Sequence, residues 1–311
     1  MGTKLSFGFF ALLLLGVCGC GLEELGVGRF TRDFHYSYPL KAGGRISIET
    51  FNGAVEITGW DQEVVEIDGA KLGPTPEAAD ALRIDVNALS DNIEIRATRP
   101  GDFRNFGSRG VRFSMKVPRK TILERIATSN GPIAVQGVSG PAHLRTSNGP
   151  IRVGNFDNNL EAHTSNGAIE LTDVGGDAVV TTSNGHIRVD NVRGALEATT
   201  SNSSITARMT GSRVSHSLRL ETTNGPVDLT LPAGFTSGAR VTSSNGSIVL
   251  HLPSDLNAHV LARTNNAAIT SQFEMKVEGV ISKNHLDAVI GNGGPLLDLA
   301  TSNGGIRLLR M

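Results

Sequence analysis

The chain has 311 residues, of which 29 are Lys or Arg and 30 are Asp or Glu, so its net charge of −1 excludes a global attraction to nucleic acid or to an anionic membrane. It is long enough to bury a core, and 5% aromatic residues with 37 glycines favour a thin, tightly turned β-structure. The two cysteines stand at positions 18 and 20, so no disulfide or thiol chemistry is expected after them.

The first predicted element is an export signal. An apolar run from Phe7 to Leu15 is too short for a membrane span and has the size of a secretory core. It leads into the letters VCGC, which resemble a bacterial lipoprotein cleavage box with Cys20 as the lipidated residue; an ordinary signal peptide is the alternative. We therefore expect a lipoprotein signal peptide over residues 1–19, a tether over residues 20–44, and membrane attachment through a lipid on Cys20.

Residues 45–120 contain strand-like runs that read RISIET, AVEIT, EVVEID, NIEIRA and VRFSMKV. Between them, Thr75 and Pro76 predict a short helix, as N-cap and first-turn residue. We expect this segment to form N-terminal coils with insertions and to cover the open end of the repeat array that follows, since an exposed terminal strand invites aggregation.

Residues 121–311 repeat the phrase Thr-Ser-Asn-Gly or a close variant. Its asparagines are spaced first by 18 residues, then by 22, 21 and 21, with one more near the end of the chain. They are Asn130, Asn148, Asn166, Asn184, Asn202, Asn224, Asn245, Asn266 and Asn303. A period near 20 with strand-type residues predicts a solenoid rather than separate hairpins.

Side chains within one period alternate between two faces. Leu160, Ala162 and Thr164 are predicted to face inward, and inward positions resume at Ile169 and Leu171 after the Asn-Gly corner. The equivalent inward pairs are Ile133 and Val135, Ile151 and Val153, Ile187 and Val189, Val227 and Leu229, and Ile248 and Leu250, and a second corner carries Val138, Phe156, Val174 or Val192. Each coil is thus predicted to be two short strands and two turns, stacked in parallel about 4.8 Å apart.

The same alternation places the corner asparagines inward, where their amides are expected to bond the backbone and, from coil to coil, each other. Glycine is expected at the corner because it tolerates positive φ. The alternative is an outward Thr-x-Asn array for ice or crystalline carbohydrate. That array would expose Leu160, Ala162 and their equivalents in every coil, at a cost of roughly 25 cal/mol per Å². We therefore predict a structural asparagine ladder.

Near the end of the chain the period breaks, because Asn266 and Asn303 are 37 residues apart, about two coils. Gly291 to Gly294 are predicted to form a tight turn, and the final letters IRLL to pair onto the last coil. Residues 121–311 are accordingly expected to be a regular β-solenoid with a C-terminal cap.

Three stretches carry a resemblance to a known family: VRFSMKVPRKTILERIATSNGPIAVQGVSG, the later SNG-x-I-x-V coils, and the closing LATSNGGIRLL. From Gly44 onward the chain resembles the bacterial adhesin-type β-strand-repeat family called domain of unknown function 4097, here in lipoprotein form. The resemblance implies an all-β, parallel β-helix of right-handed winding and an exported protein, often linked to envelope-stress systems. It implies no catalytic or binding residues.

Candidate chemistry outside the repeat is sparse. The eight histidines do not share one column of the coils, the outward acids are scattered, and the GxSxG and HExxH motifs are missing from the sequence. No metal, cofactor or catalytic residue is therefore predicted, and the lack of interleaved aromatic residues argues against nucleic acid. A cluster of basic residues is predicted either to contact lipid phosphates or acidic glycans, or to be a solvated face. It comprises Arg96, Arg99, Arg104, Arg109, Arg112, Lys116 and Arg119, with Lys120 beside it.

Together these patterns predict a single all-β parallel solenoid with one short helix near its N-terminal end. The expected function is that of a non-enzymatic, lipid-anchored protein of the bacterial cell envelope, at the outer membrane, which presents a rigid surface to an envelope glycan or protein, as an adhesin does. A periplasmic structural or envelope-stress regulatory component is one alternative. A β-helix enzyme acting on polysaccharide is the other.

Overall fold

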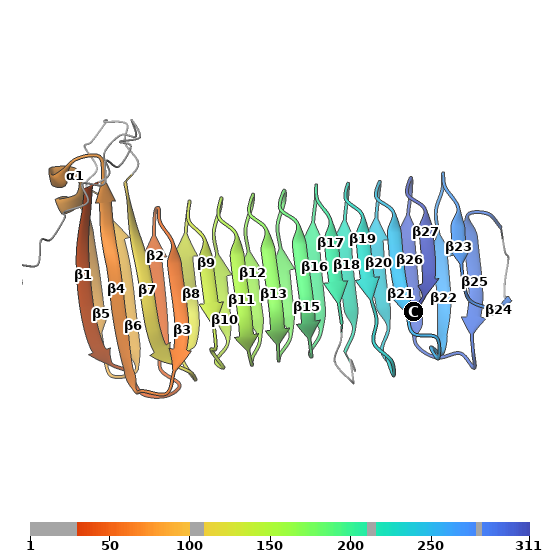
Figure 1. The fold of residues 1–311 in the computed structure, drawn as a ribbon, viewed down its shortest axis with the longest axis horizontal. Helices are drawn as coiled ribbons and strands as arrows, with labels where there is room; N and C mark the ends of the chain where they lie inside the picture. Colours follow the sequence, from red (N-terminus) through yellow and green to blue (C-terminus); the bar gives the residue numbers. More distant parts are fainter. Residues whose placement is uncertain (1–29, 100–108, 210–215, 278–281) are drawn as a thin grey trace, which may run out of the picture.

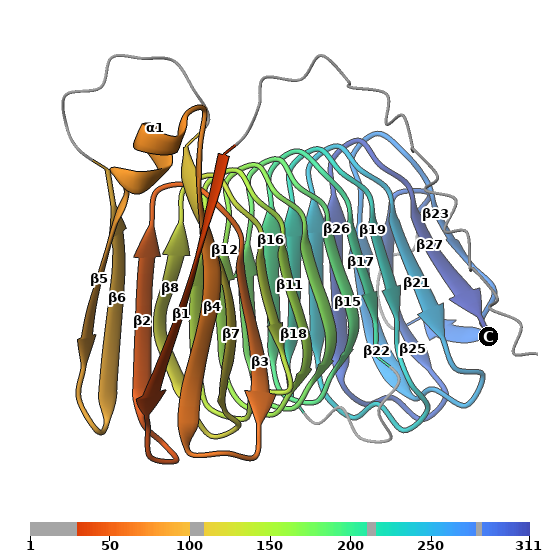
Figure 2. The ribbon, with the colours of Figure 1, turned by 60° about the vertical axis from the view of Figure 1, so that its left-hand side comes forward.

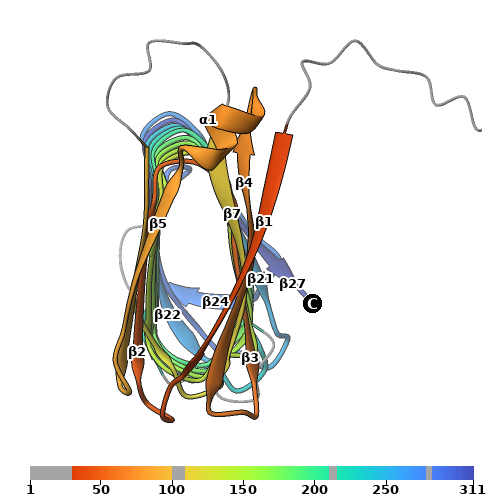
Figure 3. The ribbon, with the colours of Figure 1, turned by 90° about the vertical axis from the view of Figure 1, so that its left-hand side faces the viewer.

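The computed structural model describes residues 30–99, 109–209, 216–277 and 282–311, so the expected signal peptide, Cys20 and Arg104 lie outside the described residues. The described chain forms two long β-sheets that face each other along the molecule (Figures 1 and 3). Sheet I has 13 strands and sheet II has 14. No helix in the described ranges is long and apolar enough to cross a membrane. The predicted all-β parallel solenoid is confirmed.

The regular part of the solenoid runs from β8 to β21, and its strands alternate between the two sheets. Sheet II contributes β8 (Ile122–Thr128), β10 (Ala142–Arg145), β12 (Leu160–His163), β14 (Ala178–Thr181), β16 (Leu196–Thr200), β18 (Leu218–Thr222) and β20 (Ala239–Ser243). Sheet I contributes β9 (Ile133–Gln136), β11 (Ile151–Phe156), β13 (Ile169–Val174), β15 (Ile187–Val192), β17 (Ile205–Arg208), β19 (Val227–Thr230) and β21 (Ile248–Leu252). Equivalent residues of successive coils lie side by side, as Ile151, Ile169 and Ile187 do, because neighbouring strands pair in parallel with a shift of one coil.

The core lies between the sheets and consists of the residues predicted to face inward. Leu160 and Ala162 of sheet II and Ile169 and Leu171 of sheet I are each at most 2% exposed. The second-corner residues Val138, Phe156, Val174 and Val192 are all fully buried. The predicted coil of two strands and two turns is therefore confirmed.

Buried threonine hydroxyls hold the first corner, as expected. The Thr164 side chain is fully buried, and its hydroxyl donates to the carbonyl oxygen of Gly149 in the preceding coil at 3.0 Å. The same hydroxyl accepts from the backbone N–H of Gly167 at 3.2 Å. Each such threonine thus satisfies two backbone groups that the turn would otherwise leave unpaired.

The asparagine ladder forms, but on the outside of the corner. The Asn166 Nδ2 donates to Asn148 Oδ1 at 2.6 Å, and the bond repeats from coil to coil at 2.6 to 2.8 Å. All nine predicted asparagines take part, yet their side chains are exposed, so the inward placement was wrong. The physical reason is that the strand ends at the buried threonine, and the strand alternation does not continue through the turn.

The reason for the corner glycine also differs from the expected one. Gly149 and Gly167 do not have positive φ. A Cβ on Gly167 would instead lie 1.8 Å from the carbonyl oxygen of Gly149, so the close stacking at this corner leaves no room for a side chain. Positive φ occurs at the second corner, at Asn155 (47°), Asp173 (53°) and Asn191 (69°).

The N-terminal end departs from the simple order of coils. Its elements are β1 (Phe30–Pro39), β2 (Arg45–Thr50), β3 (Val55–Trp60), β4 (Val64–Gly73), α1 (Pro76–Asp80), β5 (Arg83–Ala88), β6 (Asn92–Thr98) and β7 (Gly110–Pro118). The coil β2–β3 lies between β6–β7 and β8–β9, while β5 and the pair β1–β4 run antiparallel at the outer edges (Figures 1 and 2). The predicted helix is confirmed, with the Thr75 hydroxyl accepting from the Ala78 N–H at 3.1 Å. Part of the expected tether is strand β1.

The C-terminal end is also interleaved. Its strands are β22 (Ala258–Arg263), β23 (Ile269–Ser271), β24 (Met275–Val277), β25 (His285–Ile290), β26 (Leu296–Thr301) and β27 (Ile306–Arg310). The final strand pairs onto the outermost coil, as expected, but it does so from inside the stack and not from its end. Strand β26 lies between β20 and β22, and β27 lies between β21 and β23, because the chain passes over one coil position after β21 (Figure 1). The antiparallel strands β25 and β24 then complete the end of sheet II.

Candidate ligand-binding groove

The outer face of sheet I carries a shallow groove that runs across β3, β9, β11 and β13. Each strand places two outward residues in register with those of its neighbours, so the face consists of two columns of side chains. Both columns contain a small residue, Ala134 on β9 and Gly154 on β11, between longer side chains. The result is an open hollow of about 510 Å³, with Ile57, Val135 and Val153 contributing to its lining.

The rim of the groove is polar and can both donate and accept hydrogen bonds. Its carboxylates are Glu56 and Glu170, its cation is Arg152, and its neutral groups are Thr58, Gln136, Asn155 and Thr172. Amides, hydroxyls and carboxylates together offer donors and acceptors within one small surface. The rim lacks a described aromatic side chain, so it provides hydrogen bonds rather than a stacking platform.

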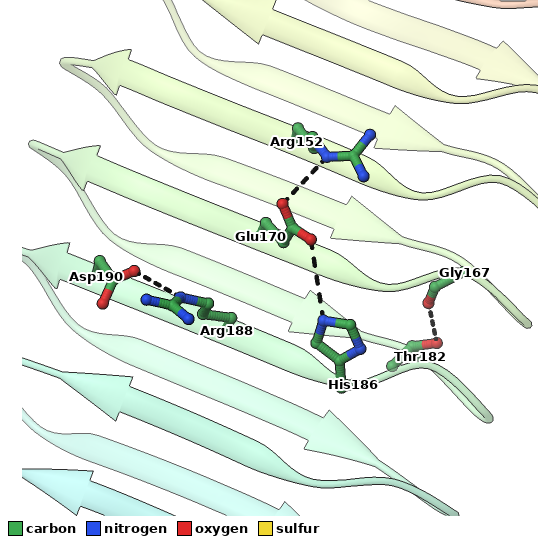
Figure 4. Close-up of polar contacts among 7 residues, drawn as sticks. All are labelled: Arg152, Gly167, Glu170, Thr182, His186, Arg188 and Asp190. Atoms are coloured by element: carbon green, nitrogen blue, oxygen red, sulfur yellow. Dashed lines mark hydrogen bonds and ion pairs between the residues drawn. The ribbon is translucent and has the colours of Figure 1, made fainter.

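Ion pairs fix the side chains at one end of the groove (Figure 4). The Nε of Arg152 donates to Glu170 Oε2 at 3.1 Å, and Nε2 of His186 lies 3.9 Å from the other carboxylate oxygen. In the next coil, Nε of Arg188 donates to Asp190 Oδ2 at 2.8 Å. That hydrogen bond, with the attraction of the carboxylate charge, raises the pKa of Arg188 above its ordinary value. The end of the groove is thus a network of charged groups pre-positioned on a rigid sheet.

The spacing of the carboxylates suits binding better than glycoside hydrolysis. Glu56 and Glu170 stand three strands apart in one column, which places their backbones about 14 Å apart. Paired catalytic carboxyl groups stand roughly 5–9.5 Å apart, and Glu170 is already engaged by Arg152. The described ranges also contain no group of three or more His, Cys, Asp or Glu side chains that could hold a metal ion.

The predicted basic cluster is divided between the two sheets. Arg96 lies on the outer face of sheet II, where Nη2 is 3.0 Å from Glu49 Oε2, beside a hollow of about 590 Å³. On sheet I, Nζ of Lys116 donates to Glu66 at 3.1 Å and lies 5.3 Å from the centroid of the Trp60 ring. Arg96 and Lys116 are thus each paired with a carboxylate, on opposite faces of the molecule.

The other members of the cluster lie around the same end of the stack. Arg119 donates to Asp61 Oδ1 at 2.6 Å, and this hydrogen bond holds the pKa of Asp61 below its usual value. The guanidinium of Arg99 lies 5.4 Å from the centroid of the Phe51 ring. The backbone oxygen of Arg109 accepts from Asn52, and Arg112 is exposed on β7. The described members therefore do not gather into one anion-binding surface.

The groove was missed by the sequence reasoning, although a signal for it exists. When coils are aligned on their corner asparagines, Glu56, Ala134, Arg152 and Glu170 each stand four residues after an asparagine. Reading down that column shows one small residue among charged ones, which is the feature that hollows the surface. The Arg152–Glu170 pair follows from the same column, because these neighbouring coils present opposite charges at equivalent positions.

Comparisons with known proteins identify one family. The family model described as Toastrack DUF4097 matches residues 44–252. A candidate adhesin from Parabacteroides merdae is 11% identical, with 89% of this chain and 96% of that chain covered and a TM-score of 0.43. A candidate adhesin from Bacteroides fragilis is 13% identical, with 90% and 97% covered and a TM-score of 0.37. A candidate cell adhesion protein from Clostridium sporogenes is 10% identical, with 90% and 100% covered and a TM-score of 0.22. Curated proteins provide no match.

Proposed function

Because the chain belongs to the Toastrack DUF4097 family, we propose that it is a non-enzymatic, adhesin-like binding protein of the bacterial cell envelope that holds a glycan in the groove on sheet I. The observation that carries the proposal is the groove itself, open along four in-register strands and rimmed by hydroxyl, amide, carboxylate and guanidinium groups. A glycan chain offers hydroxyls that both donate and accept, which is the complement of that rim.

Rigidity supports a binding role of this kind. The groove floor is the backbone of four hydrogen-bonded strands, so its shape is set by the sheet and not by loops. An extended polymer lying along the stack would meet a new set of rim groups about every 4.8 Å. Little conformational freedom of the protein is then lost on binding, which favours affinity.

Attachment to the membrane is proposed from the sequence of the leader. A lipid on Cys20 would leave residues 21–29 between the anchor and strand β1, which begins at Phe30. The N-terminal end of the stack would then lie nearest the membrane, with the C-terminal end distal to it. Protease digestion of intact cells, compared with a Cys20→Ser control, tests this: loss of the protein would place it outside the cell, and protection until the outer membrane is opened would place it in the periplasm.

The groove is tested by filling it. Ala134→Arg would place a long side chain in the hollow, whereas Thr206→Arg changes the equivalent outward position of a coil away from the groove. We expect the exported protein to be retained on immobilised envelope glycans, Ala134→Arg to lose that retention, and Thr206→Arg to keep it, with equal melting temperatures for the two variants. Equal retention by both variants would remove the groove from the proposal, and turnover of the glycan would overturn the non-enzymatic assignment.

A further inference from the structure

The coil formed by β26 and β27 occupies a slot in the solenoid that earlier parts of the chain build. One wall of the slot is the coil β20–β21 and the other is the coil β22–β23, both of which precede the inserted coil in the sequence. Strand β26 pairs in parallel with both β20 and β22, and β27 pairs in parallel with both β21 and β23. The inserted coil therefore meets backbone partners on each side, like a strand pair added to two open sheet edges.

Polar contacts set the register of the inserted coil. Asn303 joins the external ladder between the two walls: its Nδ2 donates to Asn245 at 2.7 Å and its Oδ1 accepts from Asn266 at 2.6 Å. Within the corner, the Thr301 hydroxyl donates to Gly246 and the Thr264 hydroxyl donates to Gly304, at 3.0 and 2.8 Å. A shift by one residue would break all four bonds, because side chains change face with each residue.

Charge complementarity identifies what the slot accepts. Asp298 of β26 is 8% exposed and stands between a cation of each wall. Its Oδ2 lies 2.9 Å from Nη2 of Arg240, and its Oδ1 lies 3.2 Å from Nη2 of Arg263. With the slot empty, the two guanidinium groups would lose the carboxylate that pairs with both. The slot is therefore specific for a strand that carries an acid in this register.

A short crossing, residues 291–295, joins the inserted coil to β25. The N–H of Asn292 donates to Asn257 Oδ1 at 2.8 Å, and Gly291, Gly293 and Gly294 have φ of +61°, +79° and +157°. A Cβ on Gly294 would lie 2.8 Å from the Asn257 backbone oxygen. The crossing passes tightly around the start of β22, and the contacts that hold β26 and β27 come from the slot walls.

We propose that this slot is a binding site for the β26–β27 coil of a second copy of the chain, so that two copies exchange these coils. The backbone pairs, the asparagine bonds and the Asp298 ion pairs are the same whether the coil comes from its own chain or from another, which makes exchange a low-cost route to a dimer. The five-residue crossing spans at most about 17 Å when extended, so the exchanged copies meet at their C-terminal ends.

Crosslinking between two full-length chains tests the exchange. In a Cys18→Ser, Cys20→Ser background, one chain carries Asn245→Cys and the other Asn303→Cys, so that the two thiols are neighbours only when a slot holds the coil. Ladder neighbours lie about 4.8 Å apart, which is within disulfide range. After the chains are mixed, warmed below the melting temperature and oxidised, we expect about tenfold more disulfide-linked heterodimer than from Asn130→Cys mixed with Asn303→Cys, a pair separated along the ladder.

Two further variants make the outcome decisive. A chain carrying both Asn245→Cys and Asn303→Cys should close its own disulfide, which shows that the thiols can pair. If it closes while the mixed pair gives no more heterodimer than the separated pair, exchange is overturned. Gly294→Ala strains the crossing and should raise the heterodimer yield in a chain that still melts cooperatively; an unchanged or lower yield in such a folded variant would contradict the proposal.

Discussion

The middle of the solenoid and its two ends have similar corner residues but differ in which coil each coil packs against. In the middle, each coil packs on the coil before it in the sequence, and a buried hydroxyl bonds the preceding corner, from Thr164 and Thr182 and, in β20, from Ser243. At the ends, a coil is inserted between two others, β2–β3 at one end and β26–β27 at the other. In the end coil β2–β3, the buried hydroxyl of Thr50 has no hydrogen-bond partner among the described residues. The arrangement of coils in the middle therefore follows from the local sequence repeat. At the ends it also depends on the order in which chain segments enter the stack.

Interleaving protects the terminal coils of the chain. Each inserted coil pairs with strands on both sides. The outermost strands are instead members of antiparallel pairs: β1 and β5 at one end, and β24 at the other end in sheet II. At the N-terminal end, Phe34, Tyr36 and Tyr38 of β1 form a row of ring contacts, and the Phe34 centroid lies 5.7 Å from that of Phe113. Capping of this kind reduces the edge pairing that an open parallel stack would invite.

The largest expected effect is a loss of unfolding free energy when aspartate replaces a core isoleucine in the middle of the solenoid. The same change in an edge strand at one end should cost less. Ile169 is fully buried in β13, whereas Ile84 in edge strand β5 is half-buried. Ile169→Asp would bury an unpaired charge and should cost on the order of 4–5 kcal/mol of unfolding free energy or prevent folding, while Ile84→Asp should cost clearly less. Urea unfolding followed by circular dichroism measures both, with the outward Glu161→Ala as a control near zero. Equal losses of unfolding free energy at the two isoleucines would mean that the edge strand is packed as tightly as the middle of the solenoid.

Corner glycines provide the next test, because Gly167 stacks closely on the corner before it, whereas Gly305, one residue past the last corner, has more room. A Cβ on Gly167 would lie 1.8 Å from a backbone oxygen, and a Cβ on Gly305 would lie 3.3 Å from one. Gly167→Ala must push successive corners apart and should cost about 2–4 kcal/mol, with Gly305→Ala within about 1 kcal/mol of the native protein. The chain itself carries Ser203 and Ala267 at equivalent positions, so a small cost at Gly167 would mean that the stack opens readily.

Features that depend on one repeat were predictable from the sequence, and features that depend on the order of coils were not. The period of the asparagines and the inward parity of Leu160 and Ile169 predicted the coil correctly, because both depend on neighbours within one repeat. The insertion of β26–β27 carried no local signal: nothing in the letters IRLL distinguishes a last coil from an inserted one. The groove had a signal in the column four residues after each asparagine, but its hollow depends on the in-register stacking of Ala134 with its neighbours.

Buried threonines give a smaller and more selective test of the comparison. Thr164→Val keeps the shape of the side chain but leaves the carbonyl of Gly149 and the N–H of Gly167 without the hydroxyl that joined them, at a cost of about 1–3 kcal/mol. Thr50→Val removes a buried hydroxyl that has no partner within the described part of the chain, so it should be neutral or stabilising. Thermal melting of the two variants compares them directly. A loss at Thr50 that matched the loss at Thr164 would show that the end coil is bonded like the middle.

The smallest expected effect concerns an exposed ion pair at the N-terminal end. The hydrogen bond from Arg119 lowers the pKa of Asp61 in the folded state, so the pair stabilises the fold above the unfolded pKa of about 3.9 and loses that contribution as the pH falls through the folded pKa. Asp61→Asn should therefore melt slightly below the native protein at pH 7, and the difference should vanish in acid. Because the pair is exposed, added salt should also shrink the difference. Asp33→Asn on β1 is the matched control, since Asp33 makes no ion pair within the described ranges. A gap for Asp61→Asn that persisted in acid would mean that the substitution acts through packing at this end of the stack and not through charge.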